Sequence, residues 1–165
     1  GSLVDLALSD GHGPARLLLL DRVTDPHNVG AILRSAEVFG ARAVIAPARH
    51  AAPETGALAK TASGALERQP YLRVKNLGDA IEELKAMGYI CLGLAGEAED
   101  EIDSIADQYR ARPLAFVLGA EGPGLRERTR ELCDHLVKIP FLGEFGSLNV
   151  SNAAAVSLYA VRAKP

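Results

Sequence analysis

The feature that most restricts the fold is a series of short, uninterrupted apolar segments that alternate with segments of helical periodicity. Four consecutive leucines stand in residues 16–21, and Leu114–Leu118 is equally apolar. Runs of this length without polar interruption are typical of strands buried on both faces, as in a parallel sheet. Similar but shorter runs occupy residues 43–46, 71–74, 89–94 and 136–139. We therefore predict an α/β fold with a mainly parallel sheet flanked by helices.

The chain of 165 residues fits a single domain, which we place at residues 16–165. Residues 1–15 are rich in Gly, Ser and Asp, and we expect a tail or the end of a linker there. The acidic residues 97–103 are expected to form a surface loop. Helical patterns predict helices in the segment after Asn28 up to Gly40 and at 55–65, 77–87, 125–132 and 149–162.

Composition and charge narrow the class of protein. Aromatic residues make up 5% of the chain and Trp is absent, so the core must be aliphatic. The net charge is −3, whereas nucleic-acid binders often carry a strong basic excess. A polyanionic partner would thus require locally concentrated basic groups or another module. No apolar run is long enough to cross a bilayer, and Cys91 and Cys133 are expected to be reduced thiols in a cytoplasmic protein.

Several common ligand sites are excluded by the residues that come after the predicted strands. Parallel sheets bind ligands beyond the carboxyl ends of their strands. The first strand leads into residues 22–30 without a GxGxxG pattern, and the second ends in Ala46-Pro47-Ala48 without an acidic residue for a ribose. A P-loop and a GxSxG elbow are absent as well. The four histidines are scattered, so we predict no metal site.

The first segment that indicates a function is Asn28–Gly40. Asn28 has the chemistry of a helix N-cap, and Arg34 lies on the side of the helix away from Ile32 and Phe39. A cap and a solvated helix face would account for both residues. The alternative is that both serve a site.

Two further segments carry unusual combinations of small and polar residues. In Phe116–Leu125, three glycines follow a buried strand and surround Glu121, where backbone can approach a ligand closely or turn tightly. Ser147, Asn149, Ser151 and Asn152 crowd the start of the last predicted helix, although one cap is sufficient. The alanine run after them predicts a helix against which another element packs closely.

Taken in order, the three segments resemble the motifs of the SpoU (TrmH-like) branch of the knotted SPOUT superfamily, over residues 16–162. The resemblance implies a deep trefoil knot near the C-terminus. It also implies S-adenosylmethionine as cofactor and a homodimer whose active site is completed across the interface. Asn152 stands where an apolar residue is common in the family, so the shape of that loop is left open.

The resemblance also assigns site residues. The cofactor would lie among three loops, at 94–96, 119–122 and 139–148, held largely by backbone groups. The residues expected to bind it are Leu94, Ala95, Gly96, Gly119, Ala120, Gly122, Ile139, Leu148 and Ser151. The residues expected to act on the substrate are Arg34, Asn28, Glu121, Asn149 and Ser147.

The implied reaction moves a methyl group from a sulfonium to a ribose 2′-hydroxyl of RNA, without a metal. We expect a nucleotide of ribosomal RNA, with guanosine favoured, and transfer RNA as the second choice. Arg34 would act either as a base or, since Arg stays protonated in proteins, as a stabiliser of developing negative charge. The alternatives are a base methyltransferase, a non-catalytic RNA-binding or ribosome-assembly protein on the same scaffold, and a general α/β ligand-binding module.

Overall fold

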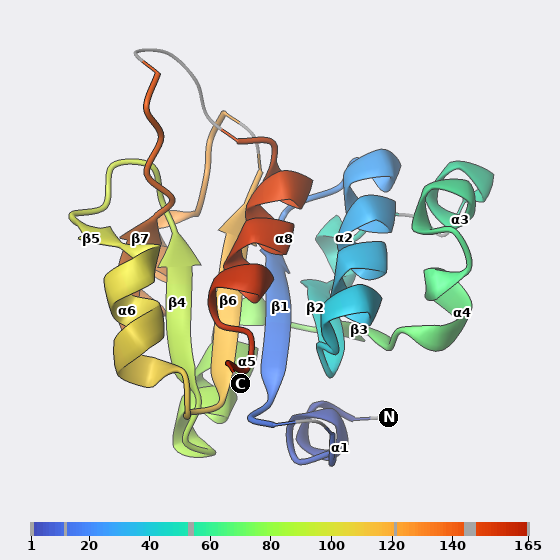
Figure 1. Ribbon diagram of the computed structural model, residues 1–165. Coiled ribbons are helices and arrows are strands. Elements are labelled where there is room, and N and C mark those ends of the chain that lie inside the picture. The colour runs from blue at the N-terminus through green and yellow to red at the C-terminus, as the bar shows by residue number, and fades with distance from the viewer. Residues whose placement is uncertain (1, 12, 53–54, 121, 144–147, 165) are drawn as a thin grey trace.

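The computed structural model describes residues 2–11, 13–52, 55–120, 122–143 and 148–164. Its centre is a seven-stranded sheet with the strand order β3-β2-β1-β6-β4-β7-β5 (Figure 1). Every neighbouring pair is parallel, as the apolar runs predict. The strands are β1 (Arg16–Asp21), β2 (Ala43–Pro47), β3 (Tyr71–Val74), β4 (Ile90–Leu94), β5 (Asp100–Glu101), β6 (Leu114–Gly119) and β7 (His135–Lys138).

Helices cover both faces of the sheet, so the molecule has three layers (Figure 1). On one face lie α2 (Pro26–Phe39), α6 (Ile102–Tyr109) and α8 (Val150–Ala160), with α3 (Gly56–Ala62) and α4 (Ala65–Arg68) against α2. The opposite face carries α1 (Leu3–Ala7), α5 (Leu77–Ala86) and α7 (Glu127–Leu132). A single 3₁₀ turn, η1 (Ala48–His50), follows β2.

The leucine run of β1 shows why the sheet is covered twice. Leu18 and Leu20 belong to the core under α2 and α8, whereas Leu17 and Leu19 belong to the core under α1 and α5. All four side chains are fully buried. Since neighbouring side chains of a strand point to opposite faces, a strand without polar alternation must be covered on both sides. The prediction of a parallel α/β fold is confirmed.

Three local predictions differ from the structure. Residues 1–15 include α1, which is held by the buried Leu3 and Ala7 and by a 2.6 Å hydrogen bond from the Tyr89 hydroxyl to the Ala7 carbonyl. The acidic stretch expected to be a loop forms β5 and starts α6. The helix expected at 55–65 is divided between α3 and α4, because Ser63 and Gly64 both adopt positive φ.

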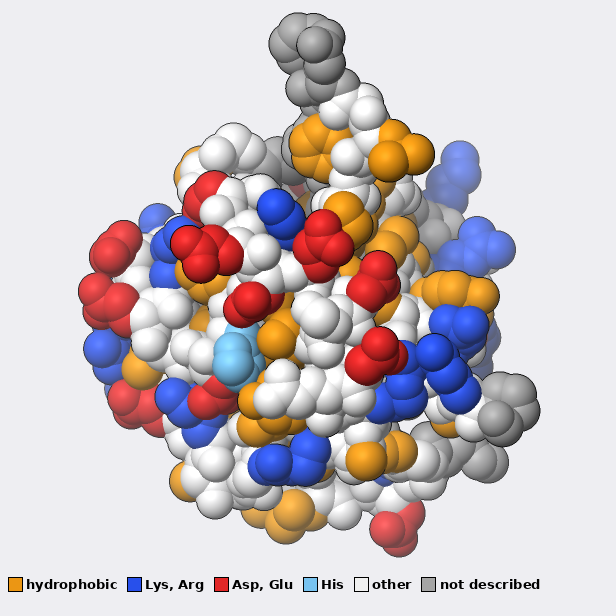
Figure 2. Space-filling model, turned by 60° about the vertical axis from the view of Figure 1, so that its left-hand side comes forward, with side chains coloured by type: hydrophobic (Ala, Val, Ile, Leu, Met, Phe, Trp, Pro, Cys, Tyr) orange, Lys and Arg blue, Asp and Glu red, His pale blue; other side chains and the backbone are white. Residues whose placement is uncertain are grey.

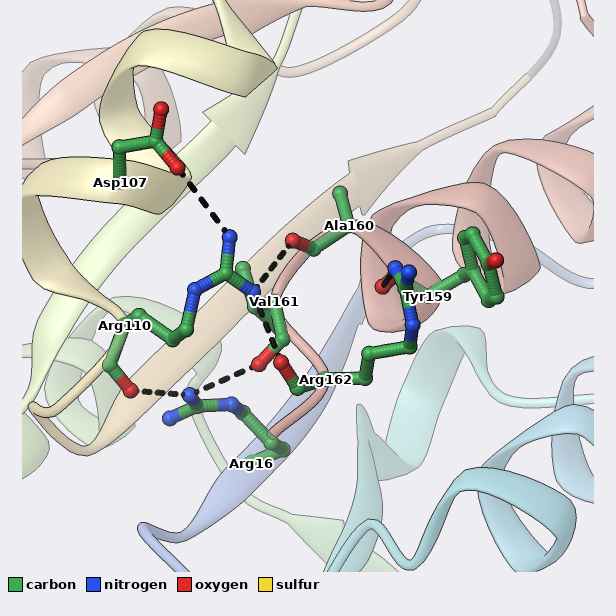
Figure 3. Close-up of polar contacts among 7 residues, drawn as sticks. All are labelled: Arg16, Asp107, Arg110, Tyr159, Ala160, Val161 and Arg162. Atoms are coloured by element: carbon green, nitrogen blue, oxygen red, sulfur yellow. Dashed lines mark hydrogen bonds and ion pairs between the residues drawn. The ribbon is translucent and has the colours of Figure 1, made fainter. Parts of the chain in front are cut away.

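Two arginines tie the end of α8 to the amino edge of the sheet (Figure 3). Arg110, just after α6, donates from Nη1 to the carbonyls of Ala160 and Arg162, both at 2.8 Å. Arg16, the first residue of β1, donates from Nη2 to the carbonyls of Val161 at 3.1 Å and Arg110 at 2.6 Å. Burial, together with the nearby Arg110 charge, lowers the pKa of Arg16 to about 10. These bonds fix the end of α8 at the amino edge of the sheet. They thereby also fix where the first turn of α8 lies at the carboxyl edge.

Candidate active site

The carboxyl ends of the strands gather the loops that the three sequence segments predict to be functional. Because the sheet is parallel, these ends share one edge, at the top of Figure 1. The helices α2 and α8 begin at the same edge. Their first turns present backbone N–H groups and partial positive charge to this side of the molecule.

The three loops predicted to hold the cofactor are neighbours in space, because they follow the adjacent strands β6, β4 and β7. Gly93 pairs with Val117 of β6, and Leu94 pairs with Val137 of β7. Beyond the strands the Ala95 amide still donates to the Val137 carbonyl at 2.9 Å. The structure therefore brings together Leu94, Ala95, Gly96, Gly119, Ala120, Gly122 and Ile139 at one edge. Their binding of a cofactor stays a prediction.

The loop after β6 folds back on itself so tightly that its glycines are required. The Gly124 amide donates to the Ala120 carbonyl at 2.8 Å, and the two residues form an isolated bridge. A Cβ on Gly119 would lie 2.2 Å from the carbonyl carbon of Gly124, and Gly122 has a φ of 82°. The loop is thus a compact turn in which position 119 has no room for a side chain, and its contact with a cofactor stays a prediction. Glu121, predicted to act on the substrate, lies outside the described residues.

An ion pair that the sequence analysis missed holds this loop against β1. The Asp21 side chain, fully buried, ends β1 and accepts from the Arg126 Nε at 2.7 Å and from the Arg126 amide at 2.9 Å. A carboxylate without solvent needs such partners. Asp21 also pairs in register with Gly119, so the bond fixes the β6 loop at its root. The sequence signal was an acidic residue directly after four leucines.

At the start of α2 the cap is Asp25, whose carboxylate accepts from the His27 amide at 2.9 Å. Pro26 occupies the first helical position, and Asn28 lies within the first turn, partly exposed. The interpretation of Asn28 as the N-cap is therefore wrong. No described residue forms a hydrogen bond with the Asn28 side chain, which lies at the edge where the loops meet.

Arg34 lies farther along α2 and is exposed. Within the described ranges, no residue forms a hydrogen bond or an ion pair with its guanidinium. Four positions on, and so on the same side of the helix, Val38 is 70% exposed. Arg34 is thus free to contact a ligand or a second chain.

At the start of α8, Asn149 is the N-cap, and its Oδ1 accepts from the Ser151 amide at 2.8 Å and from the Ser151 hydroxyl at 2.6 Å. The capping interpretation is confirmed for Asn149, and its action on the substrate stays a prediction. The preceding Leu148 is 46% exposed, and its role as an apolar wall of the cofactor site stays a prediction. Ser147 lies outside the described residues.

Elsewhere the described residues give few further candidates. A groove of about 460 Å³ between α6 and α8 is lined by charged side chains, among them Asp103, Asp107 and Arg162, and by apolar ones, among them Ile139, Val156 and Tyr159. Lys, Arg, Asp and Glu are interspersed over the face that carries it (Figure 2). No group of three His, Cys, Asp or Glu side chains in the described ranges could hold a metal.

Cys91 and Cys133 are free thiols, as expected. Burial, helped by the Asp134 charge, raises the pKa of each to about 12, so both stay protonated at neutral pH. Among the described helices, none has the length and apolar character that a membrane span needs.

Comparison with known proteins relates nearly the whole chain to RNA methyltransferases. The profile of the SpoU rRNA Methylase family matches residues 15–159. A protein of Nitrosomonas europaea named 23S rRNA (guanosine-2′-O-)-methyltransferase RlmB is 48% identical over 146 residues, which are 88% of this chain and 55% of the relative. The protein of the same name from Ralstonia nicotianae is 49% identical over 92% of this chain and 60% of its own. This chain therefore spans little more than half the length of these relatives.

Solved structures agree with the fold. The SpoU methyltransferase AviRb from Streptomyces viridochromogenes, solved in complex with the cofactor AdoMet, has a TM-score of 0.79 and 32% identity over 92% of this chain and 58% of its own. An AdoMet-bound rRNA methyltransferase from Sinorhizobium meliloti has a TM-score of 0.82 and 25% identity, with 94% of this chain and 59% of its own covered.

Proposed function

Because this chain belongs to the SpoU rRNA methylase family, we propose that it is the catalytic part of an S-adenosylmethionine-dependent RNA 2′-O-ribose methyltransferase. The observation that carries the proposal is the meeting of the loops after β4, β6 and β7 beside the first turns of α2 and α8. The substrate we infer is a guanosine of ribosomal RNA, because the relatives that are 48% and 49% identical are named for that reaction.

When bound, the cofactor would supply an activated methyl group on a sulfonium for transfer to the ribose 2′-oxygen, with the thioether as leaving group. The chain must then align the two reactants and assist the loss of the hydroxyl proton. The β6 loop suits the cofactor because its backbone can approach a ligand closely. Leu148 and Ile139 would supply apolar walls, and Ser151 would help to shape the start of α8.

Arg34 is the residue we assign to the reacting hydroxyl. Its guanidinium stays protonated, so we favour a role as a donor that holds a neighbouring phosphate or stabilises negative charge on the oxygen, over a role as base. Its exposure and the lack of a described protein partner support this assignment. Asn28, in the first turn of the same helix, would orient the ribose or Arg34, and Glu121 would position the substrate or Asn28.

The chain is also proposed to form a deep trefoil knot. The strand β7 lies beyond β4, whereas α8 packs over β6 and against α2. In the order of the sheet, α8 therefore lies two strands away from β7, and this return of the chain supports the proposal. The close packing of α8 uses its small residues, among them the buried Ala154 and Ser157.

A homodimer is proposed from the apolar surface that α2 and α8 share. Val38 and Phe39 of α2 and Val156 and Tyr159 of α8 are all more than one third exposed. The rings of Phe39 and Tyr159 meet edge to face at 6.2 Å, so the surface is continuous across the two helices. A second copy docked here would reach Arg34, one turn from Val38. Light scattering at micromolar concentration should give twice the mass of the chain, and a monomeric mass would contradict the proposal.

The test of the cofactor is a thermal melt with S-adenosylhomocysteine, with ATP as the control ligand. At one hundred times its Kd, a ligand specific for the folded state adds about 2.7 kcal/mol. For a domain of this size Tm should rise by about 5–10 °C, and ATP should give no comparable shift. No rise with S-adenosylhomocysteine would favour the non-catalytic RNA-binding alternative.

If binding is found, alkaline hydrolysis of RNA methylated by the protein distinguishes methylation of the ribose from methylation of the base, since a 2′-O-methyl group blocks cleavage at that nucleotide.

A further inference from the structure

Three arginines stand at the ends of three neighbouring strands. Arg22 follows β1, Arg49 lies in the turn η1 after β2, and Arg126 lies in the connection between β6 and α7. The order β2-β1-β6 puts these ends side by side at the carboxyl edge. All three side chains are exposed.

All three arginines lie near enough to His50, which follows Arg49, for their charges to affect its pKa. Desolvation lowers the pKa of His50 most, and the charges of Arg22, Arg126 and Arg49 lower it further. Only the buried carboxylate of Asp21 opposes them. The chain as a whole has a net charge of −3, whereas the ends of β2, β1 and β6 bring three arginines together. Such a concentration is what an acidic chain needs in order to bind a polyanion.

Arg22 and Arg49 contribute little to the fold. No described residue forms a hydrogen bond or ion pair with either side chain. Arg22 has a φ of 63°, a conformation that glycine adopts without strain. A glycine at position 22 would therefore fold at least as well. What arginine adds at this position is its charge and its donors.

We propose that Arg22, Arg49 and Arg126 form a site for phosphate groups of the RNA backbone, beside the reacting nucleotide. The inference rests on the proposed function, because the ligand is the RNA that this edge would methylate. Guanidinium groups match phosphate oxygens in charge and in fork geometry. Arg126 is bonded to Asp21, and Arg49 and Arg126 lie on either side of Arg22, which directly follows Asp21 at the end of β1.

The test is the salt dependence of RNA binding by the variant R22Q/R49Q, which keeps Arg126 on Asp21. The probe is 23S ribosomal RNA transcribed in vitro, which carries no methyl groups. The control variant R112Q/K164Q removes the same charge from exposed positions before β6 and after α8. Loss of two phosphate contacts to unpaired RNA should make the slope of log K against log salt shallower by about 1.4. At 0.1 M salt this change in slope corresponds to an affinity for RNA that is lower by about 25-fold. The control should change neither.

The outcomes separate the two proposals. A wild-type protein that neither binds nor methylates the RNA would overturn both. Methyl transfer by the wild type, with an unchanged salt slope in R22Q/R49Q, would overturn the phosphate site alone. The Tm rise with S-adenosylhomocysteine should be the same in all variants, which shows that they fold and keep the cofactor loops. R22K/R49K should restore most of the slope, because lysine keeps the charge and loses only the fork.

Discussion

The arginines at the two edges of the sheet have opposite surroundings. At the amino edge, Arg16 donates to four backbone carbonyls, Arg110 to two and Arg112 to one. Arg42 donates to the carbonyls of Ser9 and Gly13. On the side of the candidate site, Arg126 is paired with Asp21, whereas no described residue bonds the side chains of Arg22, Arg34 or Arg49.

The direction of the backbone explains the difference. Helices that connect parallel strands end at the amino edge, where their last carbonyls lack partners, and begin at the carboxyl edge, where N–H groups lack partners. Arginine has only donors, so it satisfies carbonyls and cannot satisfy N–H groups. Near helix starts its charge is also opposed by the helix dipole. Arginine therefore stabilises the fold at the amino edge, whereas at the carboxyl edge, apart from Arg126 on Asp21, it remains available to an anion.

The largest effect is expected for Arg34→Ala. If Arg34 contributes only to the reaction, and not to the fold or to cofactor binding, the rate of methyl transfer should fall by about 100-fold or more. This is the usual consequence of losing a donor to developing charge. The melting temperature and the affinity for S-adenosylhomocysteine should stay close to those of the wild type, because no described residue bonds Arg34.

The measurement is single-turnover methyl transfer at saturating RNA, together with calorimetric titration of the cofactor product. Arg34→Lys serves as the control and should recover part of the rate if charge alone is needed. Loss of cofactor affinity in Arg34→Ala would make Arg34 a binding residue. A marked drop in its melting temperature would break the distinction between the two edges.

The fold was predictable because the strands themselves carry the signal of burial on both sides of the sheet. The α6 helix was not, since only Ile102, Ile105 and Ala106 face the core in a stretch of mainly polar residues. The short α1 was missed for a similar reason: two buried side chains give no periodicity to recognise. Local patterns reveal elements that bury a full stripe, and they miss elements held by a few contacts.

Within the site, the motifs were predictable and their local geometry was not. Two segments rich in small and polar residues pointed to the loops after β6 and before α8, the resemblance added the loop after β4, and the strand order places the strands they follow side by side. The sequence contains both Asp25 and Asn28 as possible caps for α2, and only the backbone path decides between them. The Asp21–Arg126 pair joins residues 105 positions apart, so a local pattern could single out Asp21 and could not reveal its partner.

The smaller expected effect is on stability, at the amino edge. Arg16→Ala removes four hydrogen bonds from a buried guanidinium, two of them at 2.6 Å. Burial of the charge, which lowers the pKa of Arg16, offsets part of their contribution. We expect a net loss of about 3 kcal/mol in the free energy of unfolding, and a fall in Tm of about 6–12 °C.

Arg112→Ala removes one bond, to the Gly88 carbonyl at 3.1 Å, from an exposed side chain. It should cost less than about 1 kcal/mol. Urea denaturation of both variants measures the difference. Equal losses would mean that the number of carbonyls held does not set the contribution of an arginine at this edge, and the contrast with the carboxyl edge would lose its physical basis.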